Sequence, residues 1–223
     1  MKPPRSLRRL KRWFRCGGFT LIEVIVIVAT LLILVCVLIP SIVKERRKIS
    51  CEKNLREVGV AFKVCTLDGD GSFPMRVSAR FGGTKELVGS GQVFVHFQVM
   101  SNELSTPKVL VCPIDRAKKA ARRFDVGFGD TNVSYFVGVD AVDTEPNGLL
   151  SGDRNLAFQG VALKPGLFVI ATNSPISWTK TMHHSCGYVA LADGAVQLLN
   201  QSNLTFFVQQ QCPFTTSSRL AIP

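Results

Sequence analysis

The stretch that decides the fold class is residues 19–39, FTLIEVIVIVATLLILVCVLI. It is 21 residues long and holds one charged side chain, Glu23. As a helix rising 1.5 Å per residue it would span about 30 Å, the thickness of the bilayer hydrocarbon. A secretory signal peptide has a shorter apolar run and a small-residue cleavage site after it, whereas Pro40 and Ser41 follow here. The stretch therefore predicts a helix that anchors the chain in a membrane.

Basic residues surround this stretch unevenly. The whole chain of 223 residues has a net charge of +11, but seven of the excess positive charges lie in residues 1–18, which contain no acid. The remaining chain carries only +4, so the net charge does not by itself indicate a nucleic-acid binder. Four basic residues follow the span at 44–48. By the positive-inside rule, the N-terminus is predicted to be cytoplasmic.

Glu23 needs an explanation, because a carboxylate within the hydrocarbon costs about 2.5–3.5 kcal/mol on insertion scales. One interpretation is an acid tolerated near the cytoplasmic interface. The other starts from Gly17-Gly18 just before the span. Cleavage between Gly18 and Phe19 would create an ammonium group on Phe19, and Glu23 of one subunit could pair with the Phe19 amine of a neighbour.

These residues together resemble the type III signal of type IV prepilins and type II secretion pseudopilins. The resemblance is carried by the basic leader, Gly18, the string from Phe19 to Glu23 and the apolar helix after it. It implies that a membrane-embedded prepilin peptidase cuts after Gly18 and methylates Phe19, and that Glu23 acts in assembly with other pilin or pseudopilin subunits. It also implies a bacterial inner-membrane protein with a single span and a periplasmic or extracytoplasmic globular part.

The chain continues as an amphipathic helix. Apolar residues recur at spacings of four and three through 41–67, which makes one stripe of Cys51, Leu55, Val58, Phe62 and Cys65. We therefore divide the chain into a cleaved leader (1–18), an assembly helix (19–39), an amphipathic helix (40–67) and a β-rich domain (68–223). This predicts an α+β protein whose long N-terminal helix packs on a small antiparallel sheet.

Short β-rich runs are predicted in the domain at 92–100, 108–112, 133–137 and 167–172. Two further runs, 187–192 and 195–199, flank Asp193-Gly194, which predicts a hairpin in which both turn residues have positive φ. His183 precedes this Asp-Gly pair by nine intervening residues, a spacing that resembles the C-terminal signature of a class of prepilin-like proteins. Other strings that resemble recurring segments of that class are Cys51 with Asn54-Leu55, Cys112-Pro113 with Asp115, and Gly152-Asp153-Arg154-Asn155.

No cofactor is predicted. Asp68–Ser72 begins like an EF-hand loop, but the twelfth position is Ala79 instead of glutamate, so an EF-hand is excluded. A calcium loop of another type and a Gly-rich turn both stay open. His183, His184 and Asp193 are rejected as a metal or hydrolase site, because a strand of about 17 Å separates His184 from Asp193. We expect both histidines in a surface loop, no catalytic residue and no enzymatic activity.

Five cysteines lie beyond the span, in a compartment that favours disulfides. We predict at least one disulfide among Cys112, Cys186 and Cys212. Residues 116–123 hold five positive charges but no aromatic side chain for base stacking, so we expect an exposed helical turn and no nucleic-acid partner.

The expected function is a structural subunit of a type IV pilus-like or type II secretion pseudopilus filament. Two alternatives stay open: a non-polymerising, membrane-anchored extracytoplasmic binding protein, and a pilin of the DNA-uptake type.

Overall fold

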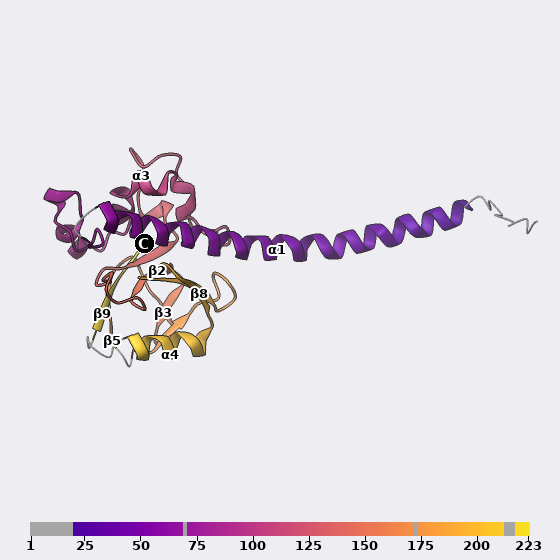
Figure 1. The fold of residues 1–223 in the computed structure, drawn as a ribbon. Helices are drawn as coiled ribbons and strands as arrows, with labels where there is room; N and C mark the ends of the chain where they lie inside the picture. The colour runs from indigo at the N-terminus through magenta and orange to yellow at the C-terminus, as the bar shows by residue number, and fades with distance from the viewer. Residues whose placement is uncertain (1–19, 69–70, 172–173, 212–216) are drawn as a thin grey trace, which may run out of the picture. The chain divides into compact units, whose positions relative to one another are not determined.

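The computed structural model describes residues 20–68, 71–171, 174–211 and 217–223. The chain divides into two compact units, Met1–Val43 and Lys44–Pro223. A long N-terminal helix is followed by a small antiparallel sheet domain, so the predicted α+β class is confirmed (Figure 1). The leader residues 1–18 and Phe19 lie outside the described residues, as do positions 69 and 70 of the candidate calcium loop.

Helix α1, Leu21–Asp68, begins with a capping box. The Thr20 backbone N–H and hydroxyl both donate to Glu23 Oε2 at 2.9 Å, and the Glu23 N–H donates back to the Thr20 hydroxyl at 3.4 Å. This exchange satisfies N–H groups that the first turn leaves without a helical partner. Residues 20–47 are all exposed. In the described part of the chain, α1 is the one helix long and apolar enough to cross a membrane, with a mean hydropathy of 3.3 in its most apolar window.

The amphipathic half of α1 buries the predicted stripe. Cys51, Leu55, Val58 and Phe62 are fully buried and Cys65 is half-buried. Burying a side chain the size of Leu55 or Phe62 stabilises the fold by about 1.5–3 kcal/mol. The opposite face stays in solvent and carries two ion pairs at helical spacing, Glu52 with Arg56 and Lys53 with Glu57.

Short helical turns occupy most of the region between α1 and the sheet. They are the 3₁₀ helices η1 (Ala79–Phe81), η2 (Lys85–Ser90), η3 (Pro107–Leu110) and η4 (Asp130–Asn132), and the α-helices α2 (Phe94–Gln98) and α3 (Ser101–Leu104). The predicted strands at 92–100 and 108–112 are therefore wrong, because α2 and η3 lie there. Residues 116–123 form bends and irregular backbone instead of the expected helical turn.

The main sheet has six antiparallel strands in the order β5-β9-β1-β2-β7-β8. Strand β1 confirms part of the predicted run at 133–137, and β5 covers the described part of the run at 167–172. A second sheet has the order β4-β3-β6. The strands are β1 (Tyr135–Gly138), β2 (Leu149–Asp153), β3 (Leu156–Phe158), β4 (Val161–Ala162), β5 (Gly166–Ala171), β6 (Ile176–Trp178), β7 (Gly187–Leu191), β8 (Val196–Leu199) and β9 (Ser217–Ile222).

The main sheet is covered on both faces. Successive side chains of a strand point to opposite faces, so Tyr135 and Val137 face one core while Phe136 faces the other. The first core contains the buried stripe of α1. The second contains Leu204 and Val208 of helix α4 (Gln201–Gln211) and residues of the second sheet. Figure 1 shows the C-terminal half of α1 and helix α4 on opposite sides of the strands.

Strands β7 and β8 form the hairpin expected around Asp193-Gly194. The turn differs from the prediction, because Gly194 has a φ of 88° but Asp193 is not among the residues with positive φ. The Gly194 N–H donates to the Leu191 carbonyl, and the Leu191 N–H donates to the Ala195 carbonyl. This is the pattern of a three-residue loop closed by a glycine in the left-handed region.

Candidate metal centre

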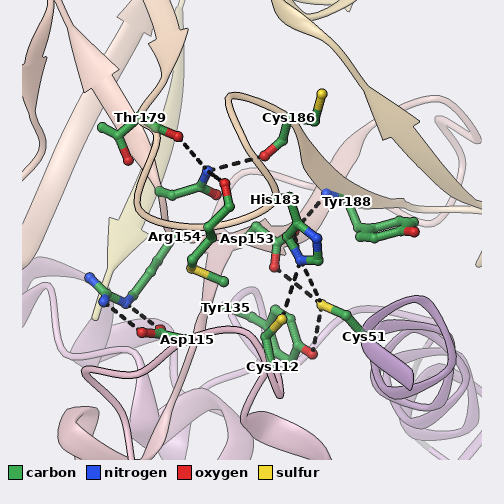
Figure 2. A network of polar contacts seen from close by, with 12 residues as sticks. Cys51, Cys112, Asp115, Tyr135, Asp153, Arg154, Thr179, His183, Cys186 and Tyr188 are labelled. Carbon is green, nitrogen blue, oxygen red and sulfur yellow. Dashed lines mark hydrogen bonds and ion pairs between the residues drawn. The ribbon is translucent and has the colours of Figure 1, made fainter. Parts of the chain in front are cut away.

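Four side chains from distant parts of the chain come together in the core where α1 packs on the sheet domain. Cys51 comes from α1, Cys112 follows η3, Asp153 ends β2, and His183 lies in the loop before β7 (Figure 2). The first three residues have no exposed surface and His183 is 6% exposed. One ligand atom from each residue lies within 4.8 Å of the others. These are the residue types that bind transition metals.

The contacts converge on one atom, Nε2 of His183. It lies 3.3 Å from Cys51 Sγ, 3.2 Å from Cys112 Sγ and 3.4 Å from Asp153 Oδ2. The Cys51 thiol also donates to Asp153 Oδ1 at 3.5 Å and lies 3.6 Å from the Tyr135 hydroxyl. The backbone N–H of Tyr188 donates to Asp153 Oδ2 at 2.7 Å, which orients the carboxylate.

Cys112 is positioned by contacts on either side of it in the sequence. The Asn54 amide, one turn of α1 after Cys51, donates to the Val111 carbonyl at 3.1 Å. Asp115 follows Cys112-Pro113 in a tight turn, where its N–H donates to the Cys112 carbonyl. The buried Asp115 carboxylate accepts two hydrogen bonds from Arg154, at 2.7 and 2.9 Å. Burial raises the pKa of Asp115, but the Arg154 guanidinium outweighs it and the net pKa is lowered.

Each residue of the string from Gly152 to Asn155 helps to build or position the cluster. A Cβ on Gly152 would lie 2.7 Å from the Phe136 ring and 2.8 Å from the Tyr188 carbonyl, so the strand needs glycine there. Asp153 enters the cluster, and Arg154 holds the turn after Cys112. Asn155 reaches the loop that carries His183.

That loop has an unusual backbone. Three consecutive residues, His183, His184 and Ser185, have φ values of 47°, 53° and 67°. This left-handed region costs an L-residue roughly 1–2 kcal/mol and persists where the surroundings enforce it. Asn155 Nδ2 lies 3.1–3.3 Å from the carbonyls of Thr179, Met182 and Cys186. The amide therefore holds the loop in the conformation that turns His183 inward (Figure 2).

The cluster shifts the pKa values of its own members. The neighbouring Cys51 and His183 lower the pKa of Cys112 to about 5, whereas burial raises the pKa of Cys51. Burial raises the pKa of Asp153 to about 7. Burial lowers the pKa of His183, but its hydrogen bond to Cys112 and the charge of Asp153 outweigh this and raise it.

The arrangement does not match a Cys-His-Asp catalytic triad. In a triad, the acid binds the histidine nitrogen that faces away from the nucleophile. Here Asp153 and both sulfurs face the same nitrogen, and Nδ1 of His183 has no hydrogen-bond partner among the described residues. The sulfurs are also buried, away from any substrate. What these four groups can do is bind a cation.

The residues that the sequence analysis had singled out as candidate sites do not all lie in this cluster. His183 is buried, so its expected place in a surface loop is wrong, whereas His184 is exposed as expected. Asp193 and Gly194 form the hairpin turn, apart from the cluster, where the Asp193 carboxylate accepts the Ala195 N–H. Cys186 is not a member of the cluster, and its backbone carbonyl accepts a hydrogen bond from the Asn155 amide. Cys212, Gly18 and Phe19 lie outside the described residues, so the predicted disulfide and cleavage site stay predictions.

Sequence reasoning did not propose a metal site, although a signal was present. Three strings noted for their resemblance to prepilin-like proteins supply Cys51, Cys112 and Asp153, and the fourth residue of the cluster, His183, belongs to the C-terminal signature. Comparison with models of known protein families, with curated proteins and with solved structures found no match to this chain.

Proposed function

We propose that this chain is a structural subunit of a type IV pilus-like or type II secretion pseudopilus filament, assembled through the apolar half of α1. The observation that carries the proposal is the contrast within α1. Residues 20–47 are all exposed, whereas the stripe that starts at Cys51 is buried in the globular unit. Within it, residues 20–43 form an apolar surface available to lipid and to neighbouring helices, and this surface contains one carboxylate, Glu23.

Processing is part of the proposal. Cleavage between Gly18 and Phe19 by a prepilin peptidase, followed by methylation of the new amine, would remove the basic leader. Mass spectrometry of protein extracted from membranes of cells that contain this peptidase tests the step. Gly18→Val should block it, because the family requires glycine at that position. An intact leader in such cells would contradict the proposal.

Glu23 would have two roles, capping α1 and pairing with a neighbouring subunit, and two substitutions distinguish them. It closes the capping box with Thr20, and in a filament it would pair with the Phe19 amine of a neighbour. A glutamine at this position of a capping box preserves the hydrogen bonds. Glu23→Gln therefore keeps the cap and removes the charge, and Glu23→Ala removes both.

The experiment is co-expression of each variant with the wild type, followed by counting both forms in membrane and sheared-filament fractions. Pairing predicts that both variants insert but are depleted from filaments, because a buried ammonium left without its partner costs about 3–5 kcal/mol. Capping alone predicts depletion of Glu23→Ala only. Glu45→Gln is the matched control, since Glu45 lies on α1 in an exposed ion pair with Lys48. Equal partition of all forms would favour a non-polymerising anchored protein.

A further inference from the structure

We propose that Cys51, Cys112, Asp153 and His183 bind one zinc ion in a closed tetrahedral site. The site would hold α1 against the sheet and the His183 loop. This proposal concerns the globular unit, and it does not depend on whether the chain forms filaments.

The distances between the ligand atoms fit zinc. Zinc–sulfur bonds of about 2.3 Å and zinc–nitrogen bonds of about 2.0–2.1 Å, at tetrahedral angles, separate sulfur from nitrogen by about 3.5 Å and nitrogen from oxygen by about 3.3 Å. The observed separations from His183 Nε2 are 3.3 Å to Cys51 Sγ, 3.2 Å to Cys112 Sγ and 3.4 Å to Asp153 Oδ2. Small side-chain movements would complete the tetrahedron.

Hydrogen bonding by itself leaves this cluster poorly satisfied. A ring nitrogen has either one proton to donate or one lone pair with which to accept. Nε2 of His183 nevertheless faces two sulfurs and a carboxylate oxygen at nearly equal distances. One proton cannot serve three acceptors well, whereas one cation at the common centre contacts all four ligand atoms. Buried charged groups are usually paired or bound to a metal, and Asp153 is fully buried.

The ligand set selects the type of ion. Thiolate, imidazole and carboxylate groups all bind zinc, and two thiolates favour it, whereas calcium and magnesium prefer oxygen ligands throughout. Four protein ligands leave no open position for a substrate or an activated water, so the site is structural. Surrounding contacts match this role, because the Tyr188 N–H fixes the Asp153 carboxylate and Arg154 fixes the turn after Cys112.

Metal analysis of the full-length chain in detergent, purified without chelators, tests the proposal. We expect one zinc per chain in the wild type and a loss of at least tenfold in Cys112→Ser and His183→Gln. The matched controls are Cys186→Ser and His184→Gln, which alter the same residue types nearby and should keep the metal. Zinc retained equally in all five proteins, or absent from the wild type, would overturn the proposal.

Two measurements on the wild type cover the case in which the ligand variants fail to fold. Replacing zinc with Co²⁺ should give thiolate-to-cobalt charge-transfer bands and the intense visible absorption of tetrahedral cobalt. Octahedral cobalt without thiolate bands would count against the site. Mass spectrometry after alkylation under denaturing, non-reducing conditions with a chelator should find Cys51 and Cys112 both alkylated. A Cys51–Cys112 disulfide in protein taken from the membrane would overturn the proposal.

Discussion

Asn155 shows how a single side chain can hold a strained loop. Its Nδ2 lies within hydrogen-bond distance of three carbonyls, those of Thr179, Met182 and Cys186, on the loop that carries three consecutive left-handed residues. The amide has two N–H groups to donate, so all of its donor capacity is directed at this loop. The conformation of His183 therefore depends on a residue that is not itself one of the four members of the cluster.

The first prediction is that Asn155→Asp destabilises the globular unit more than Asn155→Ala does. The alanine variant leaves buried carbonyls unpaired, at a cost of about 1–3 kcal/mol in the free energy of unfolding. The aspartate variant turns an acceptor toward the same carbonyls and should cost more. Chemical denaturation of the detergent-solubilised chain measures both. Asn203→Asp, an exposed change in the first turn of α4, is the control, and an equal loss there would contradict the explanation.

The second prediction concerns His96, which is buried with its Nδ1 2.7 Å from the Thr84 hydroxyl. Burial lowers the pKa of His96 from 6.5 to about 4. Between these values the unfolded chain binds a proton that the folded chain does not, so the free energy of unfolding should fall as the pH drops from 6.5 to 4. The shift corresponds to about 3 kcal/mol.

The measurement is the free energy of unfolding across that pH range for the wild type and His96→Gln. The variant lacks the titrating group, so the difference between the two curves should shrink as the pH falls. The exposed His184 supplies the control, since His184→Gln should follow the wild-type curve throughout. Parallel curves for the wild type and His96→Gln would show that His96 does not titrate in this way.

At the scale of elements, the spacing of apolar residues correctly predicted the amphipathic half of α1 but wrongly predicted a strand where α2 lies. The polar positions of the amphipathic half of α1 make its period unambiguous. Residues 92–100 are mostly apolar, so their alternation fitted a strand. The buried residues are Val93, His96, Phe97 and Met100, at helical spacings of three, one and three. Likewise, Thr106-Pro107 is a helix-start signal just before the strand predicted at 108–112, and the Thr106 hydroxyl accepts the Lys108 N–H there.

The third prediction compares two glycines that pack between elements. A Cβ on Gly59 of α1 would lie 3.6 Å from Gly194 of the hairpin, an ordinary contact, and alanine favours a helix over glycine by about 1 kcal/mol. Gly59→Ala should therefore leave the thermal midpoint unchanged or raise it. Gly152→Ala should lower it strongly, because its Cβ would overlap the Phe136 ring. Thermal unfolding of both variants checks the opposite signs, and two losses of similar size would contradict the packing described.

At the scale of the whole molecule, the sequence predicted the fold class but not the cluster. The membrane-length run and the amphipathic stripe are local patterns, and each can be read within a few turns of helix. The cluster joins Cys51 to His183 across 132 positions. Cys51 looked like one more apolar position of the stripe, and His183 looked like a loop residue, because neither role is visible until the sheet brings them together.

The fourth prediction is that removing the metal weakens the globular unit without releasing the chain from the membrane. A ligand at 100 times its dissociation constant stabilises the folded state by about 2.7 kcal/mol. For a unit the size of Lys44–Pro223, this corresponds to a fall of about 5–10 °C in Tm when a chelator strips the zinc. Under the proposed function, anchoring should persist, since it would depend on the exposed apolar residues of the other unit.

Two readouts on the same membranes check this separation. Thermal unfolding with and without chelator should shift for the wild type and for His184→Gln, and should not shift for His183→Gln. Alkaline carbonate extraction should leave all three proteins in the pellet under both conditions. An unchanged wild-type Tm would mean that no bound metal stabilises the unit. Release of the chain by chelator would mean that attachment to the membrane depends on the cluster as well as on the apolar half of α1.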